Sequence, residues 1–199
     1  GNEVVTYIVD RNVNYTNVCV SGCRFCAFYR TEDAPDAYVL LFEELCAKVE
    51  ETLALEGTAI LLQGGLHPTL GIEWYETMLR DLKARYPIHV HGFSPSEVDF
   101  WATLYRMEAR EVIRQLIAAG LDSMPGGGGE ILVQRVRDIV APKKAGADRW
   151  LEIMEIAHEE GLKTSCTMMF GIGETLEERM EHLLRLRDVQ SRTKGFTAF

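Results

Sequence analysis

The sequence predicts an α/β fold built from alternating strands and helices. Two observations support it: short apolar runs recur between longer amphipathic segments, and helix-capping residues bound several of those segments. Alternation of this kind gives right-handed parallel βα units, which form either a barrel or a doubly wound sheet. Six strands are expected, and the sixth ends at the C-terminal Phe199.

The expected elements follow one another in chain order. Strands are predicted at residues 12–18, 59–63, 88–92, 120–124, 163–170 and 196–199. Helices are predicted at residues 42–55, 72–86, 110–119, 148–160 and 176–190. A closed eight-stranded barrel needs more chain than this. We therefore expect one domain, residues 1–199, that is incomplete at its C-terminus and does not fold well alone.

Local signals support individual helices. Thr175 and Glu178 have the spacing of a capping box at the start of the last helix. Gly120 and Gly161 lie just past two other helices, where a left-handed residue is needed. In the first helix, one face is expected to be apolar and the other to face water: Leu41, Leu45, Val49 and Leu53 against Glu43, Lys48 and Glu51.

The composition is that of a soluble globular enzyme, with 47% hydrophobic and 26% charged residues. The net charge is −9 and no basic stripe exists, so nucleic acid is not an expected partner. No apolar run approaches the roughly 18 residues of a membrane span. The N-terminal GNEVVTYIVD lacks the basic patch and cleavage site of a signal peptide. We therefore expect a cytoplasmic protein without a membrane partner.

Three of the five cysteines are clustered. Cys19, Cys23 and Cys26 have the spacing C-x3-C-x2-C in the loop after the first predicted strand, which lies on the active face of parallel βα architecture. Three thiolates suit a cubic iron–sulfur cluster with one iron left open. A structural zinc site needs a fourth ligand, for which Cys46 on a helix face and Cys166 in mid-strand are poorly placed. Burial as small hydrophobic residues is the remaining alternative.

Two glycine-rich segments follow predicted strands. Gly64 and Gly65 come after Gln63, where glycine permits positive φ and close approach of the backbone to a ligand. Four consecutive glycines, residues 126–129, follow Asp122 and suggest a similar approach in a binding loop. A plain turn and a flexible surface loop are the respective alternatives.

Two histidines share one face of the third strand. Strand alternation places His89 and His91 together, and an inward face favours hydrogen bonding or proton transfer to a substrate. Metal ligation and an ordinary core or solvated position are the alternatives. We interpret the same segment as continuing through Ser94 to Glu97, and Glu97 is a second candidate for a polar contact with the substrate.

The cysteine spacing, with Phe25 before the last cysteine, resembles the radical S-adenosylmethionine (SAM) superfamily. The resemblance implies a partial (β/α)6 TIM-type barrel, a [4Fe-4S] cluster on the three cysteines, and SAM bound to the open iron as the source of a 5′-deoxyadenosyl radical. It implies that Gln63, Gly64 and Gly65 contact the SAM amino group, although Leu66 stands where an acidic residue is usual. The remaining cofactor-binding residues that it implies are Phe25, Gly171 and Glu174. For Glu174, an ordinary loop position just before the Thr175 cap, where negative charge favours the helix dipole, is the alternative.

Longer segments resemble the dehypoxanthine futalosine cyclase family of menaquinone biosynthesis. They are VTYIVDRNVNYTNVC, CRFCAFYR, LQGGLHP, HVHGFSPSEV, GLDSMPGGGGEILVQRVR and TMMFGIGETLEER. Aminofutalosine synthase and the FO synthase subunits are the alternatives within the superfamily, and a non-catalytic, metal-stabilised binding domain is the alternative outside it. The TYIVDRN and DSMPGGGGEIL segments favour the cyclase.

The cyclase resemblance implies hydrogen abstraction from the ribose C4′ of a nucleoside-like substrate. The carbon radical then attacks a benzoate ring, and loss of an electron and a proton completes the cyclisation. A low-potential electron donor is an implied partner. The candidates for the base or polar contacts are His91 and Glu97, and the candidates for substrate binding are Asp122, Gly127, Arg135 and Arg137.

Overall fold

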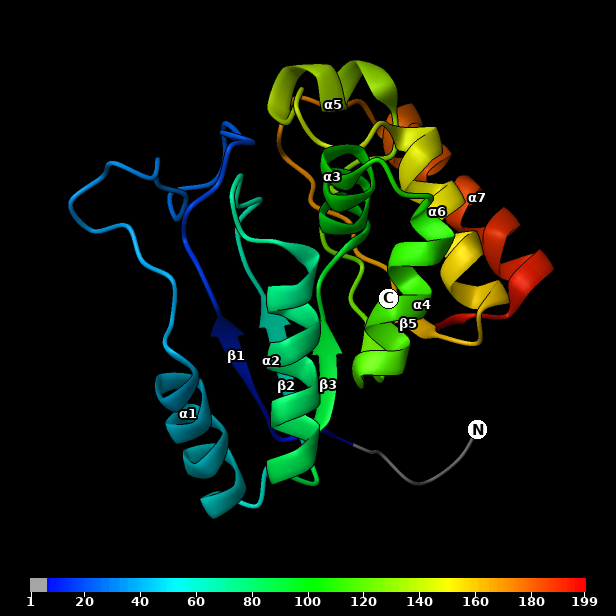
Figure 1. Cartoon of the computed structure of the whole chain (residues 1–199). Coiled ribbons are helices and arrows are strands. Elements are labelled where there is room, and N and C mark those ends of the chain that lie inside the picture. Colours follow the sequence, from blue (N-terminus) through cyan, green and yellow to red (C-terminus); the bar gives the residue numbers. More distant parts are fainter. Residues whose placement is uncertain (1–6) are drawn as a thin grey trace.

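The computed structural model describes residues 7–199, and its six strands form one parallel sheet in the order β1 to β6. Residues 1–6, which are six of the ten residues behind the signal-peptide expectation, lie outside the described residues. The strands are β1 (Asp10–Asn14), β2 (Ala59–Gln63), β3 (His89–Gly92), β4 (Ser123–Met124), β5 (Lys163–Ser165) and β6 (Phe196–Ala198). The helices are α1 (Phe42–Ala54), α2 (Ile72–Arg85), α3 (Pro95–Tyr105), α4 (Ala109–Ala119), α5 (Gln134–Val140), α6 (Ala147–Glu159) and α7 (Leu176–Thr193) (Figure 1).

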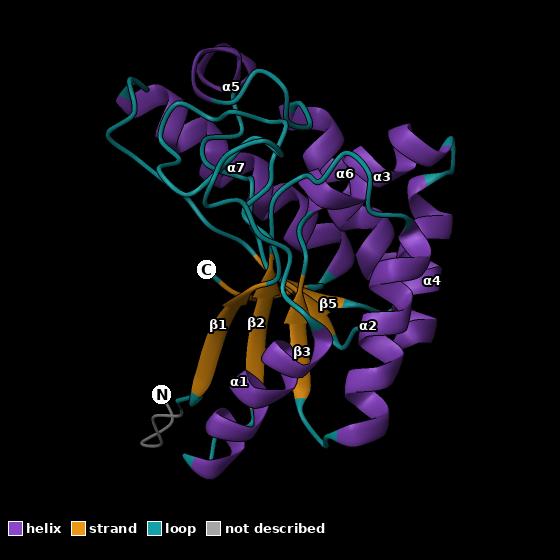
Figure 2. Cartoon of the chain, turned by 60° about the vertical axis from the view of Figure 1, so that its left-hand side comes forward, coloured by secondary structure: helices purple, strands orange, loops and turns teal. Residues whose placement is uncertain are grey.

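The strand order is that of a barrel wall. Each strand pairs in parallel with the next strand in the sequence, whereas a doubly wound sheet reverses its order at a switch point. Among the described residues β1 and β6 are the two edges and do not pair with each other. The expected partial (β/α)6 barrel is confirmed, and long loops gather beyond the arrowheads of β1, β2 and β3 (Figure 2).

The two faces of the sheet differ in burial. Side chains such as Ile60, Leu62 and Val90 point outward and are fully buried in the main core against the helices. On the opposite face, Leu61 pairs in register with His91, and both are only half-buried. The inner face of the barrel wall therefore remains accessible along β2 and β3.

Several strand boundaries differ from the prediction. The first strand ends at Asn14 rather than at residue 18, because Thr16 and Val18 leave the sheet and make isolated bridges elsewhere. The fourth begins at Ser123, because Leu121 still bonds back to α4 through its amide. The fifth ends at Ser165 rather than at residue 170, so Cys166 follows the strand instead of lying within it.

Two helices were not predicted, α3 and α5. The amide of Glu97 donates to Ser94 Oγ at 3.3 Å, and Pro95 occupies the first helical turn. This Ser-Pro-x-Glu start is a helix signal, so continuing the third strand through Glu97 was wrong. Helix α5 directly follows the glycine loop and is only seven residues long.

The predicted caps are confirmed. The Glu178 amide donates to Thr175 Oγ1 at 3.2 Å, and the Thr175 amide donates to the Glu178 carboxylate at 2.7 Å. Gly120 and Gly161 have φ values of +117° and +85°. Leu41 does not belong to the buried face of α1, because it is the N-cap residue and is 70% exposed. Among the helices of residues 7–199, none has the length and apolar character that crossing a bilayer requires.

Candidate functional site

Three thiols line one cavity at the carboxyl ends of the strands. Cys19, Cys23 and Cys26 lie in the loop after β1 and border a cavity of about 190 Å³. Gln63 at the end of β2 and Gly127 after β4 border the same cavity. The fold therefore gathers residues from three strand ends around the cysteine loop.

The cysteine loop is fixed by backbone and sulfur hydrogen bonds. The Cys19 amide donates to the Arg30 carbonyl at 2.9 Å, and the Cys26 amide donates to the Cys23 carbonyl at 3.1 Å. The Ser21 amide lies 3.4 Å from the Cys19 sulfur, and Ser21 Oγ lies 3.1 Å from the Cys23 sulfur. Donors of this kind stabilise metal-bound thiolates and tune iron–sulfur centres.

The arrangement of the thiols fits a cluster bound by three cysteines. Within residues 7–199, no three His, Cys, Asp or Glu side chains are grouped as the ligands of a single metal ion. In a cubic cluster each thiolate binds a different iron, so the three sulfurs do not have to converge on one metal ion. Cys46 and Cys166 are both buried and do not border the cavity.

The glycines after β2 are required by the protein's own packing. A Cβ on Gly64 would lie 2.3 Å from the Tyr15 ring, and one on Gly65 would lie 2.0 Å from the Val18 carbonyl oxygen. Neither glycine has a positive φ, so that part of the prediction was wrong. Both still border the cavity, and their lack of a side chain seats β2 against the stem of the cysteine loop.

The four-glycine loop also has a packing function. A Cβ on Gly126 would meet Cys166 Cα at 2.6 Å, and one on Gly127 would meet Gln63 Nε2 at 2.7 Å. Gly128 has a φ of +77°. Gly127 and Gly128 border the cavity, so the loop forms one of its walls.

Glu97 is a buried carboxylate that joins the ends of three strands. It is 3% exposed, accepts the Tyr15 hydroxyl at 2.5 Å and the Ser94 hydroxyl at 2.6 Å, and also accepts the Gly64 amide. Burial raises its pKa to about 7, although these hydrogen bonds and the charge of Lys144 act in the opposite direction. Glu97 borders the cavity, but its oxygens are already engaged by the protein.

Glu97 should make stability depend on pH. The ordinary carboxyl releases its proton near pH 4.5 in the unfolded chain, whereas folded Glu97 holds its proton until about pH 7. Its contribution to the free energy of unfolding therefore falls as the pH rises through this window, by roughly 3 kcal/mol. We expect Glu97→Gln to flatten the profile measured by chemical unfolding of the metal-free protein between pH 5 and pH 8. Glu181→Gln, a change at an exposed glutamate, is the control. If the free energy of unfolding depended on pH equally in the wild type and in Glu97→Gln, the assignment to Glu97 would be wrong.

Arg137 does not reach the cavity, contrary to prediction. Its guanidinium is 1% exposed and donates to the carbonyls of Gly128 at 2.9 Å, Gly129 at 3.0 Å and Ala145 at 2.9 Å. It also lies 3.3 Å from the Glu130 carboxylate. Burial lowers the pKa of Arg137, while the negative charge of Glu130 raises it. Each of its three nitrogens donates to a partner within the chain, so it shapes the glycine loop and does not face the cavity as a substrate ligand.

Two further substrate candidates lie away from the cavity. Asp122 accepts from Lys83 Nζ at 2.8 Å and from the Val90 amide at 2.7 Å. Arg135 is exposed and forms an ion pair with Glu178 on α7. Their charges are satisfied by neighbouring elements, which the sequence pattern could not reveal.

Gly171 and Glu174 also lie outside the cavity lining. The Glu174 carboxylate accepts the amides of Gly171 at 2.7 Å and Ile172 at 2.8 Å and pairs with Arg179. The hydrogen bond from the Gly171 amide is the largest cause of its pKa falling to about 2. Glu174 thus closes its own loop before α7, as the alternative interpretation expected.

His91 lies on the inner face of the sheet and borders the barrel interior rather than the cysteine cavity. His91 Nδ1 and His89 Nε2 each lie 2.7 Å from Ser123 Oγ. Burial and the charge of His89 lower the pKa of His91, although Asp10 opposes them. The predicted pair therefore shares one face and one hydroxyl partner.

Lys144 is a residue of the cavity that the sequence analysis missed. Its ammonium lies 3.0 Å from the Glu130 carboxylate and 5.4 Å from the centroid of the Phe25 ring. Burial lowers the pKa of Lys144, but the negative charges of Glu130 and Cys23 outweigh burial and raise it. The only feature of the sequence that pointed to Lys144 was the Lys-Lys pair after Pro142, which is unusual in a chain of net charge −9.

Comparison with curated proteins identifies close relatives with two different names. The chain is 46% identical over 199 residues to a cyclic dehypoxanthine futalosine synthase of Streptomyces coelicolor, and 46% identical over 197 residues to one of Halalkalibacterium halodurans. It is 47% identical over 198 residues to a 5-amino-6-(D-ribitylamino)uracil–L-tyrosine 4-hydroxyphenyl transferase of Methanopyrus kandleri. These matches cover 98–99% of this chain and 50%, 53% and 54% of the respective relatives, so the chain spans about half their length.

Solved structures share the fold at low sequence identity. A maturase of the [FeFe]-hydrogenase matches with a TM-score of 0.74 and 16% identity over 96% of this chain and 42% of its own. Methylornithine synthase matches with a TM-score of 0.70 and 13% identity over 92% of this chain and 50% of its own. At these identities the likeness concerns the fold alone.

The family model of the radical SAM superfamily matches residues 13–186, from β1 to α7. The match includes the cysteine loop and every residue that borders its cavity. The thiol-lined cavity thus lies in the part of the chain that matches a sequence family whose cofactors are a [4Fe-4S] cluster and SAM. The chain is a member of the radical SAM superfamily of enzymes.

Proposed function

We propose that this chain is the cofactor-binding part of an enzyme that cyclises dehypoxanthine futalosine in menaquinone biosynthesis. The main observation in favour of radical chemistry is that Cys19, Cys23 and Cys26 line the same cavity as the end of β2. Two cyclic dehypoxanthine futalosine synthases at 46% identity support the choice of substrate. The segment DSMPGGGGEIL, which forms a wall of the cavity through Gly127 and Gly128, also favours the cyclase.

When bound, the cluster and SAM supply hydrogen-atom abstraction at the ribose C4′ of the substrate. The cysteine loop would hold the cluster, and Gln63, Gly64 and Gly65 border the same cavity, where their backbone would orient SAM. Phe25 borders the cavity, and its ring lies 5.4 Å from the Lys144 ammonium. The chain must also supply a group that takes the proton released when the benzoate ring is restored.

We assign that proton to His91. Burial lowers the pKa of His91 and so favours the neutral imidazole, which is the form that accepts a proton. Ser123 fixes the ring through Nδ1 at 2.7 Å and leaves Nε2 for the substrate. Glu97 fits this task less well, because Tyr15, Ser94 and Gly64 already occupy its oxygens.

The substrate is tested with the full-length protein, anaerobically reconstituted and reduced. Incubation with SAM and dehypoxanthine futalosine should yield 5′-deoxyadenosine and a product lighter by two hydrogens, as read by mass spectrometry. The Methanopyrus kandleri relative at 47% identity makes hydroxyphenyl transfer the second candidate. A parallel incubation with tyrosine and 5-amino-6-(D-ribitylamino)uracil tests it, and product in that reaction alone would overturn the cyclase.

His91→Ala is expected to lower the cyclised product by about a hundredfold while 5′-deoxyadenosine formation falls far less. The reason is that SAM cleavage precedes the proton loss assigned to His91. His89→Ala is the matched variant, because His89 shares the Ser123 hydroxyl but is exposed at the start of β3. Equal product from His91→Ala and the wild type would rule out this role.

The partners and the location of the enzyme are part of the same proposal. A low-potential electron donor and a nucleoside-like small molecule are the proposed partners, in a cytoplasmic location. The net charge of −9 supports the absence of nucleic acid from this set.

A further inference from the structure

One ammonium group enters the cavity that holds the cysteine loop. Lys144 lies in the loop between α5 and α6, and its side chain is 17% exposed. Among the residues that border the cavity in the described part of the chain, it is the only lysine or arginine. Its charge and the thiol of Cys23 therefore border the same cavity.

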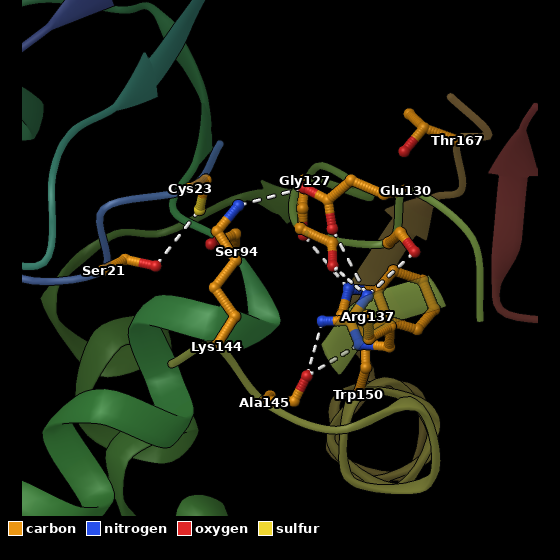
Figure 3. A network of polar contacts seen from close by, with 12 residues as sticks. Ser21, Cys23, Ser94, Gly127, Glu130, Arg137, Lys144, Ala145, Trp150 and Thr167 are labelled. Atoms are coloured by element: carbon orange, nitrogen blue, oxygen red, sulfur yellow. Dashed lines mark hydrogen bonds and ion pairs between the residues drawn. The ribbon is translucent and has the colours of Figure 1, made fainter. Parts of the chain in front are cut away.

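Two further charges fix the position of this ammonium (Figure 3). The Glu130 carboxylate is 7% exposed and contacts Lys144 through one oxygen, at 3.0 Å, and Arg137 through the other, at 3.3 Å. Arg137 is anchored in turn to the carbonyls of Gly128, Gly129 and Ala145. We call Arg137, Glu130 and Lys144 the charge brace.

The charge brace carries a net positive charge. Two cations share one anion, and the cation nearer the cavity is Lys144. Charges on side chains that are largely shielded from solvent, as those of Lys144 and Glu130 are, interact more strongly than charges in water. An ammonium held in this way therefore exerts a steady positive potential on the cysteine loop.

We propose that the charge brace raises the reduction potential of the cluster held by the cysteine loop. A cluster gains one negative charge when it is reduced, so a fixed cation stabilises the reduced form more than the oxidised form. Lys144 is thus a positioning residue that makes electron delivery to the cluster easier. This inference rests on membership of the superfamily and not on the substrate proposed above.

Lys143 provides a control for solvent exposure. It lies in the same loop, carries the same charge and donates to the Val20 carbonyl of the cysteine loop at 3.4 Å, but its side chain is exposed. Solvent and salt screen a charge in such a position. Its removal changes the net charge of the protein as much as removal of Lys144 does.

The test is a redox titration of the full-length, reconstituted protein, with the reduced cluster followed by electron paramagnetic resonance. At a fixed potential, Lys144→Gln should lower the ratio of reduced to oxidised cluster about tenfold, which corresponds to about 59 mV. Lys144→Arg and Lys143→Gln should stay within about threefold of the wild type. Glu130→Gln, which removes the anion of the charge brace, should shift the ratio in the opposite direction.

Iron content and circular dichroism equal to the wild type establish that each variant holds its cluster and is folded. With these matched, an unchanged ratio in Lys144→Gln would overturn the proposal. So would an equal decrease in Lys144→Gln and Lys144→Arg, because packing rather than charge would then be responsible. No substrate enters the titration, so failure of the proposed cyclisation leaves its outcome unaffected.

Discussion

Replacement of Cys23 with alanine is expected to abolish the iron–sulfur cluster. The thiol lies in the cavity with Cys19 and Cys26, and each thiolate of such a cluster binds a separate iron. Anaerobic reconstitution of Cys23→Ala should therefore give protein with near-zero iron and without the brown absorbance of the wild type. The same loss is expected for Cys19→Ala and Cys26→Ala.

Cys166→Ala is the control for these variants. Cys166 is also buried, but it follows β5 and its sulfur faces the Ala198 carbonyl at 3.4 Å, outside the cavity. The Cys166→Ala protein should bind as much iron as the wild type. Iron content at the wild-type level in Cys23→Ala, or zinc in its place in the wild type, would refute the cluster assignment.

Replacement of Arg137 with methionine is expected to destabilise the protein by about 3–5 kcal/mol. The change leaves the Glu130 carboxylate without one of its two cationic partners and frees the buried carbonyls of Gly128, Gly129 and Ala145. Removing one partner from a buried ion pair has a cost of this size. Guanidinium unfolding of wild type and variant under identical conditions measures the difference.

Arg135→Ala tests whether this cost comes from burial. Arg135 lies two residues away on the same helix and also pairs with a glutamate, Glu178, but its side chain is 51% exposed. An exposed pair contributes about 1 kcal/mol or less. Similar losses for the two variants would show that Arg137 is not the anchor of the glycine loop.

The cysteine loop could be predicted because its information is local. Spacing alone places Cys19, Cys23 and Cys26 in one loop, and capping residues locate the ends of α4 and α7. The strand order followed from the alternation of elements once a known family suggested a barrel. These features depend on residues that are near one another in the sequence.

The failed predictions for Arg137 and Lys144 involve irregular loops that bring together residues 7 to 14 positions apart, where no helical or strand periodicity applies. Arg137 was expected to bind substrate, but the loop that carries Ala145 folds back and encloses it. Lys144 enters the cavity because Glu130 draws it there, and nothing in its own neighbourhood indicates that partner. The start of α3 is a different failure, since its Ser94-Pro95 signal was present and was read as a continuing strand.

The carboxylate of Glu97 has a consequence for protein engineering. It joins Tyr15 on the stem of the cysteine loop to Gly64 after β2 and to Ser94 before α3. A cysteine loop transplanted alone into another barrel would lose two of these three attachments. The smallest transferable cassette is therefore a set of three strand ends, drawn from segments more than 80 residues apart in the chain.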